Sequence, residues 1–425
     1  MLTRCKTCLI AEVRSFSKKA DFNFGYFLKN GFWMATKPTA TLVGGLILSI
    51  VFARFATKEI FGQYNILISY LTLASVFSLP GLNVAIFRAG SKNYDGVYRS
   101  AVKMSLRFGT LGMISLAIAG LYFLFIENNQ LFGIALIISA IFFPFMYSLS
   151  KWDILLMSKE KFDISGKYYS LVTIVSYLLV VLAVFLKSES LLIIFSVYLI
   201  TNSFFHLLMY IKTRSCLENR TEEKDWKKTG WILSFVSFFD IIYSNADKII
   251  LAFFLDSASV AVYSISMTVS SQLRNIVGRF LQIYTPKIYK LELSVFFDKL
   301  KKTSLFFGVP FLLSLISIAL FIPSLINLLY TEKYSESAAY AQLALITVPF
   351  YLVTSILIII ANKERKESAQ MASKIISGII NLALYLLLIP RLGILGAVIA
   401  SVSFFMAQSM IMLGLIGWKF MKKTS

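Results

Sequence analysis

The sequence predicts an all-α membrane protein with about twelve transmembrane helices, arranged as two six-helix halves. Three observations support this fold class: the apolar composition, the recurrence of long apolar runs, and the charge of the segments between them. Hydrophobic residues make up 57% of the 425 positions and charged residues 15%. Soluble domains have about 45–50% apolar and about 25% charged residues. A soluble fold of this chain would therefore expose a large apolar surface to water.

Long apolar runs recur along the chain. A hydrocarbon core of about 30 Å requires roughly 20 helical residues to cross it. We expect spans at 32–53, 64–87, 104–126, 131–150, 166–186, 190–211, 230–255, 260–285, 304–329, 337–361, 370–389 and 392–418. No compact apolar core with a cleavage site follows the basic residues 1–30, which favours a retained first span over a secretory signal peptide.

The segments between these runs alternate in positive charge. Of the 42 Lys and Arg residues, 32 lie in the two tails and in the loops 88–103, 151–167, 212–228, 287–302 and 363–374, and only five lie in the opposite loops. Cytoplasmic loops of multi-pass proteins carry the excess of Lys and Arg. We therefore expect a multi-pass protein of a bacterial or archaeal cytoplasmic membrane, with both termini cytoplasmic.

The two halves show a weak internal repeat. Gly31 and Tyr64 near the first two spans correspond to Gly230 and Tyr263 near the seventh and eighth, each at an offset of 199 residues. The expected organisation is a cytoplasmic tail (1–31), a six-helix bundle (32–211), a cytoplasmic linker (212–229), a second six-helix bundle (230–418) and a cytoplasmic tail (419–425). Parallel repeats of this kind usually enclose a central cavity that opens alternately to each side.

The sequence also argues against several function classes. The net charge of +20 comes from short clusters between apolar runs, so we expect no nucleic-acid partner. Cys5 and Cys8 form a single C-x-x-C, and the only histidine, His206, is distant, so no metal site is expected. No phosphate-binding loop motif is present, and the non-cytoplasmic loops are too short for a catalytic domain. We expect no enzyme, no catalytic residues and no cofactor.

Three segments resemble the polysaccharide transporters of the MOP flippase superfamily. The first is FAR at 52–54 followed by KEIFGQYN at 58–65, the second is NADKIIL at 245–251 followed by VAVYS, and the third is LGILGAVIA at 392–400. Together with the two six-helix halves, the resemblance covers nearly the whole chain. It implies a Wzx-type flippase, which moves a polyprenyl-pyrophosphate-linked oligosaccharide (an O-antigen, capsule or exopolysaccharide repeat unit) across the inner membrane by alternating access.

The resemblance further implies that the first, second, seventh and eighth spans border the central cavity. The implied partners are the lipid-linked oligosaccharide, membrane lipids, H⁺ or Na⁺, and a polymerase with other glycan-assembly proteins. Elementary physics explains why such a substrate needs a polar path. A sugar chain and a pyrophosphate cannot enter hydrocarbon without losing their hydrogen bonds to water, whereas the lipid tail can remain in the bilayer.

Ionisable residues within spans are costly, which makes them candidates for function. Asp240 and Asp247 lie seven residues apart on one face of the seventh span, and we expect them to be ion-coupling or gating groups. The candidate cavity cations, expected to meet pyrophosphate or acidic sugars, are Lys37, Arg54, Arg88, Lys248, Arg274 and Arg279. The candidate polar lining residues are Ser244, Asn245, Gln272 and Asn275.

Structural roles remain open for some of these residues. Asp247 is also a candidate ion-pair partner of Arg274 or Lys248, and Arg88 and Arg279 are candidate anchors at the cytoplasmic interface. Other functions remain open as well. A multidrug extruder driven by Na⁺ or H⁺ shares the twelve-span pattern, although a cationic lumen suits anions better than cationic drugs. A lipid II flippase resembles fourteen-span proteins, and a membrane polymerase of glycan assembly needs a larger external loop.

Overall fold

The computed structural model describes residues 24–290, 293–364 and 366–424; residues 1–23, which include Cys5 and Cys8, lie outside the described residues. The described residues form helices and short connections, without a strand. The helices of the first half are α2 (Phe24–Phe55), α3 (Lys58–Ala74), α4 (Leu82–Gly90), α5 (Gly96–Phe125), α6 (Gln130–Phe143), α7 (Trp152–Ser158), α8 (Phe162–Leu186) and α9 (Leu191–Thr213). Those of the second half are α10 (Trp226–Phe254), α11 (Ser257–Lys290), α12 (Leu293–Tyr330), α13 (Ser337–Ala344), α14 (Thr347–Lys363), α15 (Glu367–Leu392) and α16 (Ile394–Thr424).

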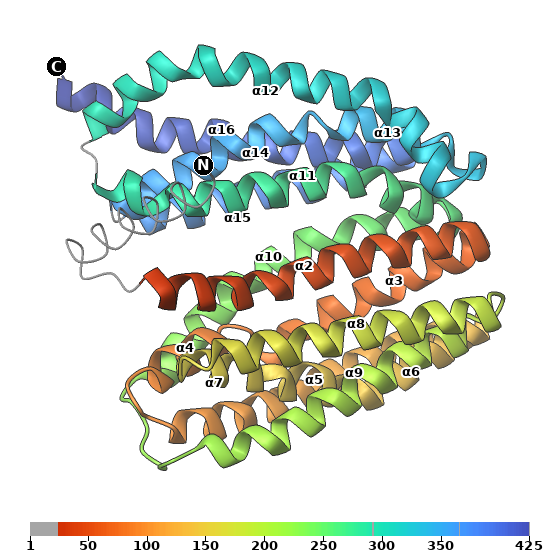
Figure 1. The fold of residues 1–425 in the computed structure, drawn as a ribbon. Coiled ribbons are helices and arrows are strands. Elements are labelled where there is room, and N and C mark those ends of the chain that lie inside the picture. The colour runs from red at the N-terminus through yellow and green to blue at the C-terminus, as the bar shows by residue number, and fades with distance from the viewer. Residues whose placement is uncertain (1–23, 291–292, 365, 425) are drawn as a thin grey trace, which may run out of the picture.

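The long helices run side by side in two bundles, one above the other in Figure 1. We call α2–α9 the N-lobe and α11–α16 the C-lobe. Helix α10 crosses between them and packs against α3 and α4 of the N-lobe as well as α15 of the C-lobe. We call the end that carries the connection 214–225 between α9 and α10 the linker end, at the left of Figure 1, and the opposite end the far end.

The predicted fold class is confirmed. Each of the twelve predicted spans corresponds to one helix or to two helices joined by a short break. Within the described residues, ten segments are long and apolar enough to cross a membrane. Helices α10 and α11 are also long, at 29 and 34 residues, but they carry the polar and charged side chains that reduce their hydropathy. These are the two helices on which most of the predicted site residues lie.

Two of the N-lobe spans are interrupted by proline. The second span breaks at Leu79, which has a φ of 55°, before Pro80 and Gly81. The fourth span departs from α-helical geometry at Pro144, through a π-helical turn that ends at Ser148. Proline lacks an N–H and removes a helical hydrogen bond, so each break leaves backbone groups that need other partners.

Lys151 supplies one such partner and corrects a prediction. The charge count placed Lys151 in a cytoplasmic loop, but the structure buries it, with 2% of its surface exposed. Its ammonium donates to the carbonyl of Ser78 at the break in the second span, at 3.2 Å. The loop prediction was wrong for this residue because a lysine at a span end can turn its chain back into the bundle when an acceptor lies there.

Glycine allows a close helix contact in the N-lobe. A Cβ atom added at Gly120 of α5 would lie 2.9 Å from the carbonyl oxygen of Gly133 on α6, and one added at Gly133 would lie 2.7 Å from that of Gly120. The two backbones therefore touch directly, as small residues permit in membrane bundles. His206, the only histidine, accepts a hydrogen bond from the indole of Trp152 at 3.1 Å between Nε1 and Nδ1, and so packs α9 against α7.

Candidate functional site

The two lobes are joined at the far end by a set of polar contacts. Arg54 at the end of α2 donates to the carbonyls of Leu328 and Leu329, the last turn of α12. Across the same boundary, Ser49 bonds Tyr330 (3.1 Å), Lys58 pairs with Glu336 (2.7 Å), and Lys333 donates to the carbonyl of Ala56 (2.7 Å). We call these residues the far-end latch. An arginine at a helix C-terminus satisfies free carbonyls and complements the helix dipole, so the latch holds the lobes together here.

Helices α3 and α11 also touch at the far end. A Cβ atom added at Gly62 of α3 would lie 1.6 Å from the carbonyl oxygen of Ser257 at the start of α11. Only glycine permits this approach. Because α3 is a central helix of the N-lobe and α11 belongs to the C-lobe, the contact closes the far end between them (Figure 1).

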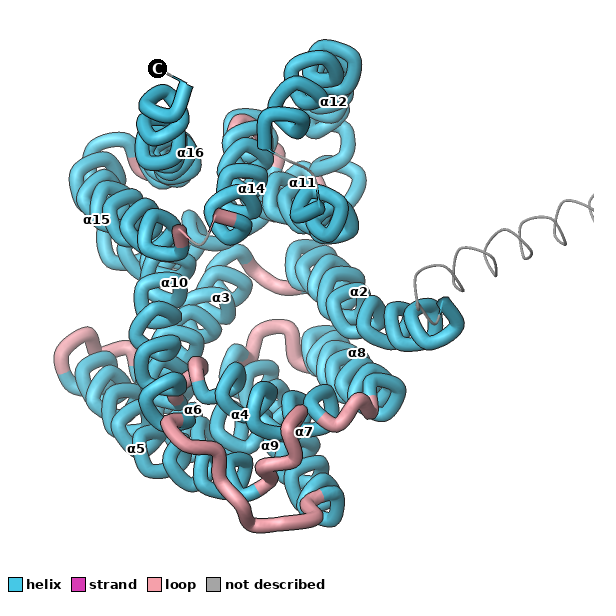
Figure 2. Tube along the Cα trace, turned by 90° about the vertical axis from the view of Figure 1, so that its left-hand side faces the viewer, coloured by secondary structure: helices cyan, strands magenta, loops and turns pink. Residues whose placement is uncertain are grey.

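At the linker end the lobe boundary is held on one side by α4 and α10. The N–H of Gly81 donates to the hydroxyl of Ser234 at 3.0 Å, and Gly230 lies against Leu82. Figure 2, which looks at the linker end, shows α10 and α2 on opposite sides of the boundary between the lobes. The linker-end halves of α10 and α11 therefore flank this boundary.

Helix α11 carries a polar stripe beside the boundary. Thr268, Gln272, Asn275 and Arg279 follow one another at the spacing of a single helix face. Thr268, the residue of the stripe nearest the far end, contacts Tyr330, whose hydroxyl also bonds Ser49 of the N-lobe. The stripe therefore begins at a contact between the lobes. Asn275 is exposed, and Arg279 is half-buried and forms no hydrogen bond or ion pair within the described residues. Gln272 and Asn275 bond each other weakly at 3.5 Å.

Arg274 lies on a different face of α11 and points into the C-lobe. Its guanidinium donates to Thr347 at 2.6 Å and to Ser270 at 3.2 Å, and it stands 4.8 Å from the centre of the Phe405 ring. No carboxylate pairs with it among the described residues. The sequence left open a pair between Asp247 and Arg274, and the structure does not form it. An arginine held by hydroxyls and an aromatic face keeps its positive charge available to an anion.

The two aspartates of α10 both face the C-lobe. Asp240 pairs with Lys374 of α15, at 3.1 Å, and accepts from the hydroxyl of Tyr243 at 2.6 Å. Asp247 accepts from the hydroxyl of Tyr263 at 2.8 Å and from the backbone N–H of Lys248. Asp240 is thus already neutralised, whereas Asp247 forms no ion pair within the described residues.

The hydroxyl network around Asp247 continues across the C-lobe. The hydroxyl of Tyr263 also lies 3.0 Å from that of Ser401 on α16, which in turn lies 2.9 Å from the hydroxyl of Tyr385 on α15. The network that starts at this carboxylate therefore links α10, α11, α16 and α15. Such a network aligns Asp247 but leaves its negative charge without a fixed cation.

The remaining predicted residues fall in three environments. Ser244 and Asn245 each donate a hydrogen bond to a carbonyl of their own helix, α10. Ser244 is exposed and lies one helical turn before Lys248. Lys37 pairs with Asp153 of α7 at 2.6 Å, within the N-lobe. Arg88 lies at the linker end, largely exposed, with its Nε 3.9 Å from Glu223. Arg54 belongs to the far-end latch, so the six predicted cations do not converge on one point.

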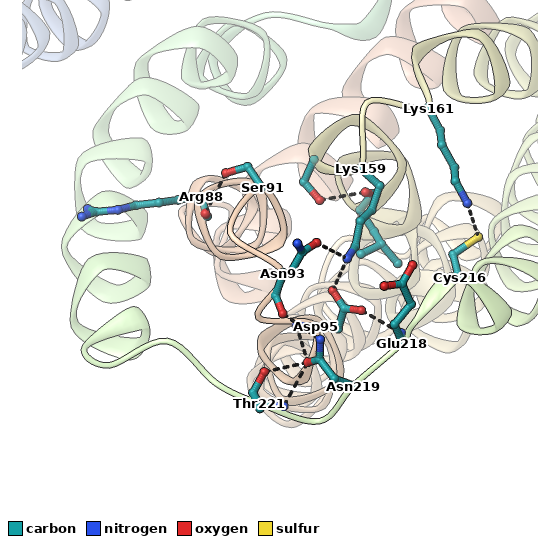
Figure 3. A network of polar contacts seen from close by, with 12 residues as sticks. Arg88, Ser91, Asn93, Asp95, Lys159, Lys161, Cys216, Glu218, Asn219 and Thr221 are labelled. Carbon is teal, nitrogen blue, oxygen red and sulfur yellow. Dashed lines mark hydrogen bonds and ion pairs between the residues drawn. The ribbon is translucent and has the colours of Figure 1, made fainter.

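The connection between α9 and α10 is tied to the N-lobe (Figure 3). Asp95, fully buried, pairs with Lys159 at 2.7 Å and accepts from the N–H of Glu218 at 2.8 Å. Gly96 donates its N–H to the carbonyl of Thr221 at 2.8 Å. A hydrogen bond from Ser100 lowers the pKa of the Glu222 carboxyl. The predicted linker is therefore an ordered part of the N-lobe surface.

Sequence reasoning missed three charged partners. Lys151 and Asp153 fall in the predicted loop 151–167, and Lys374 falls where the predicted loop 363–374 and span 370–389 overlap. In the structure each lies in a helical segment: Lys151 donates to a buried carbonyl, and the other two pair with half-buried side chains. The available signal was complementary charge: Asp240 and Lys37 each sit inside a span and need an opposite charge. Which residue supplies it depends on helix packing, which charge alternation does not show.

Several solved structures with a similar fold are titled as transporters or flippases. A structure titled as the lipid II flippase MurJ in an inward closed conformation has a TM-score of 0.72 at 14% identity, covering 91% of this chain and 87% of that one. An inward-facing multidrug resistance MATE family transporter has a TM-score of 0.58 at 12% identity, covering 91% and 96%. A MOP superfamily transporter from Pyrococcus furiosus has 0.56 at 11%, covering 93% and 95%. These likenesses show that the chain has the MOP-superfamily fold.

Sequence comparison agrees with the fold. No curated protein sequence matches this chain. The model of a family described as polysaccharide biosynthesis protein matches residues 27–292, more than half of the chain, from α2 to the end of α11. The match includes the far-end residues of α2, the polar stripe of α11 and both aspartates of α10. This multi-pass membrane chain belongs to the polysaccharide biosynthesis protein family.

Proposed function

We propose that this protein is a flippase that moves a polyprenyl-pyrophosphate-linked oligosaccharide across a cytoplasmic membrane by alternating access. The observation that carries the proposal is the asymmetry of the lobe boundary. The far-end latch joins the lobes at one end. Along the other half Asn275 of α11 is exposed, and Arg279 forms no ion pair within the described residues. A polar, cationic surface that opens at one end at a time is what a lipid-linked anion needs.

In this proposal the linker end faces the cytoplasm, since the basic loops gather there. Arg279 would receive the pyrophosphate in the linker-end half of the boundary. Lys248, next to the Asp247 that bonds Tyr263 near the start of α11, lies closer to the far end and would meet acidic sugars there, while Arg274 would add positive potential from within the C-lobe. Gln272, Asn275 and Ser244 would bond sugar hydroxyls. Asp247, which forms no ion pair within the described residues, would bind the coupling H⁺ or Na⁺, and breaking the far-end latch would open the route outward.

The experiment is a transport assay in liposomes. Purified protein is reconstituted with a radiolabelled polyprenyl-pyrophosphate oligosaccharide, and cleavage by an external glycosidase is followed with and without imposed H⁺ and Na⁺ gradients. Protein-dependent exposure of the sugar, reduced in Arg279→Gln but not in the exposed N-lobe control Arg107→Gln, supports the proposal. Lipid II is assayed in parallel, because the protein titled lipid II flippase shares the fold. No exposure of any lipid-linked saccharide would refute it.

A second candidate function is ion-coupled extrusion of drugs. The similarity to a multidrug resistance MATE family transporter favours it. The unpaired cations Arg274 and Arg279 speak against a cationic drug as substrate. Efflux of ethidium from the same liposomes under a Na⁺ or H⁺ gradient, without flipping of a lipid-linked saccharide, would establish this alternative.

A further inference from the structure

An apolar groove runs along the side of the N-lobe between α2 and α8. It has a volume of about 590 Å³, and its walls extend from Trp33 to Ile47 on α2 and from Lys167 to Val181 on α8. At a rise of 1.5 Å per residue, each wall is about 21 Å long. The groove therefore spans about two thirds of a hydrocarbon core of about 30 Å.

The groove is open to the surroundings of the bundle. Val43, Ile47, Ile174 and Leu178 line it and are all exposed, so their apolar side chains face the bilayer rather than another helix. Glycine at position 44 lets the Tyr177 ring pack directly against the backbone of α2. A Cβ atom added at Gly44 would lie 2.2 Å from this ring. A larger residue there would displace the ring into the groove.

The charged residue that lines this groove lies at one end of it. Lys167 occupies the part nearest the linker end together with Thr36 and Ser170, and the other polar lining residues are Thr39 and Tyr177. The hydroxyl oxygen of Ser170 is buried and has no hydrogen-bond partner. The Lys167 side chain is exposed. An apolar channel with an exposed cation at one mouth complements an amphiphile with a long tail and an anionic head.

We propose that this groove holds the prenyl tail of the lipid-linked substrate as it enters from the membrane, with the phosphate nearest the lipid lying at Lys167 before the head group moves on to Arg279; the inference rests on the proposed function. Helix α2 forms one wall of the groove and also borders the lobe boundary at the linker end, where it lies between α8 and α11 (Figure 2). A tail seated against α2 therefore places its head beside that boundary while the tail stays in the bilayer. A cationic drug would gain nothing from Lys167.

The test uses a polyprenyl monophosphate that carries a photoreactive diazirine in its tail and no sugar. The full-length protein in nanodiscs is labelled with light, and the labelled peptides are mapped by mass spectrometry. We expect labels on α2 and α8 between 33 and 47 and between 167 and 181. Ile174→Trp, which fills the groove, should lower this labelling about tenfold, equivalent to about 1.4 kcal/mol. Lys167→Gln should weaken competition by unlabelled polyprenyl phosphate.

The matched control is Ile118→Trp, which adds the same side chain at an exposed position of α5. It should leave labelling unchanged. Equal competition by phosphatidylglycerol and by polyprenyl phosphate would overturn the inference in favour of a general lipid seat, and so would labels outside the groove. The liposome assay on the same preparation separates the two proposals. If the wild type flips the substrate but its groove is not labelled, only the groove proposal is refuted. If the groove is labelled but no saccharide lipid is flipped, only the transport proposal is refuted.

Discussion

Lys151 donates a hydrogen bond to the carbonyl oxygen of Ser78, 3.2 Å from its ammonium, inside the N-lobe. Ser105 of α5 donates to the same oxygen at 2.6 Å. The second span breaks directly after Ser78, at Leu79, so this carbonyl is not used by a continuing helix. Two donors from different spans, Lys151 and Ser105, therefore stabilise the break. They also stabilise the position of α4, which follows the break and packs against α10.

The first prediction concerns this shared acceptor. Lys151→Met and Ser105→Ala each leave one donor on the Ser78 carbonyl, but the double variant leaves it buried without a partner. That state costs about 1–3 kcal/mol, so the loss of stability in the double variant should exceed the sum of the single losses. Thermal unfolding in detergent, analysed as a double-mutant cycle, measures the difference. Combining Lys151→Met with Ser139→Ala, a buried serine that bonds its own helix, should be additive.

The second prediction concerns the far-end latch. In a variant without its three cysteines, Lys58→Cys and Glu336→Cys are joined across the lobes by a cleavable bifunctional thiol reagent. If the far end must open during transport, flipping should stop on cross-linking and return on cleavage. Tyr122→Cys with Glu127→Cys, a pair within the N-lobe at the same end, is the control. Full transport by the cross-linked lobes would contradict an opening at the latch.

The third prediction concerns Arg274. Arg274→Gln should lower flipping at least about tenfold, because the C-lobe loses a cation that no carboxylate neutralises. Arg274→Lys should not restore it, since one ammonium cannot bond Thr347 and cover the Phe405 ring together. The liposome assay measures the rate, with protein amount and melting temperature checked for each variant. Wild-type rates in Arg274→Gln would assign this residue to packing only.

The fourth prediction separates charge pairing from ion coupling at Asp240. Asp240→Asn leaves Lys374 unpaired, and Lys374→Met leaves Asp240 unpaired, so each single variant should be less stable than the double variant. Thermal unfolding gives the order. If the double variant still flips with the wild-type dependence on the ion gradient, Asp240 is a structural residue, and Asp247 is left as the coupling group. Loss of gradient dependence in the stable double variant would instead assign the coupling to Asp240.

The fifth prediction concerns the connection on the N-lobe. Asp95→Asn removes the buried partner of Lys159, which costs about 3 kcal/mol for a buried pair. We expect the segment 214–225 to detach and become sensitive to trypsin, which cleaves after its Arg and Lys residues. Glu218→Gln, on an exposed side chain of the same segment, should remain resistant. Equal resistance of both variants would show that Asp95 does not hold the connection.

Much of the fold followed from patterns that depend only on the solvent. A bilayer demands long apolar helices and sorts basic loops to one side, so spans and alternation were readable along the chain. Proline in the sequence indicated the breaks at Leu79 and Pro144. It did not indicate which side chains bond the backbone groups that the breaks leave free. Lys151 and Lys374 look like loop cations by sequence position, and only the packed bundle shows that Lys151 reaches a buried carbonyl and Lys374 reaches Asp240.

The candidate site was predictable in part. The polar spacing of Gln272, Asn275 and Arg279 on one face of α11 is local, and helix geometry alone places these residues together. Which partners neutralise Asp240 and Lys37 is not local, because Lys374 and Asp153 lie more than a hundred residues away in the chain. The same holds for the groove between α2 and α8, which exists only where two distant helices meet.

The sequence by itself determined that this chain is a helical membrane protein, because composition and periodicity report directly on the solvent that each helix must face. The tertiary structure decided which charges are paired, at which end the lobes are joined, and where the apolar groove between α2 and α8 lies. Those features depend on contacts between helices far apart in the chain, and a single buried ion pair or close glycine contact can choose among packings that the apolar pattern leaves equal in energy.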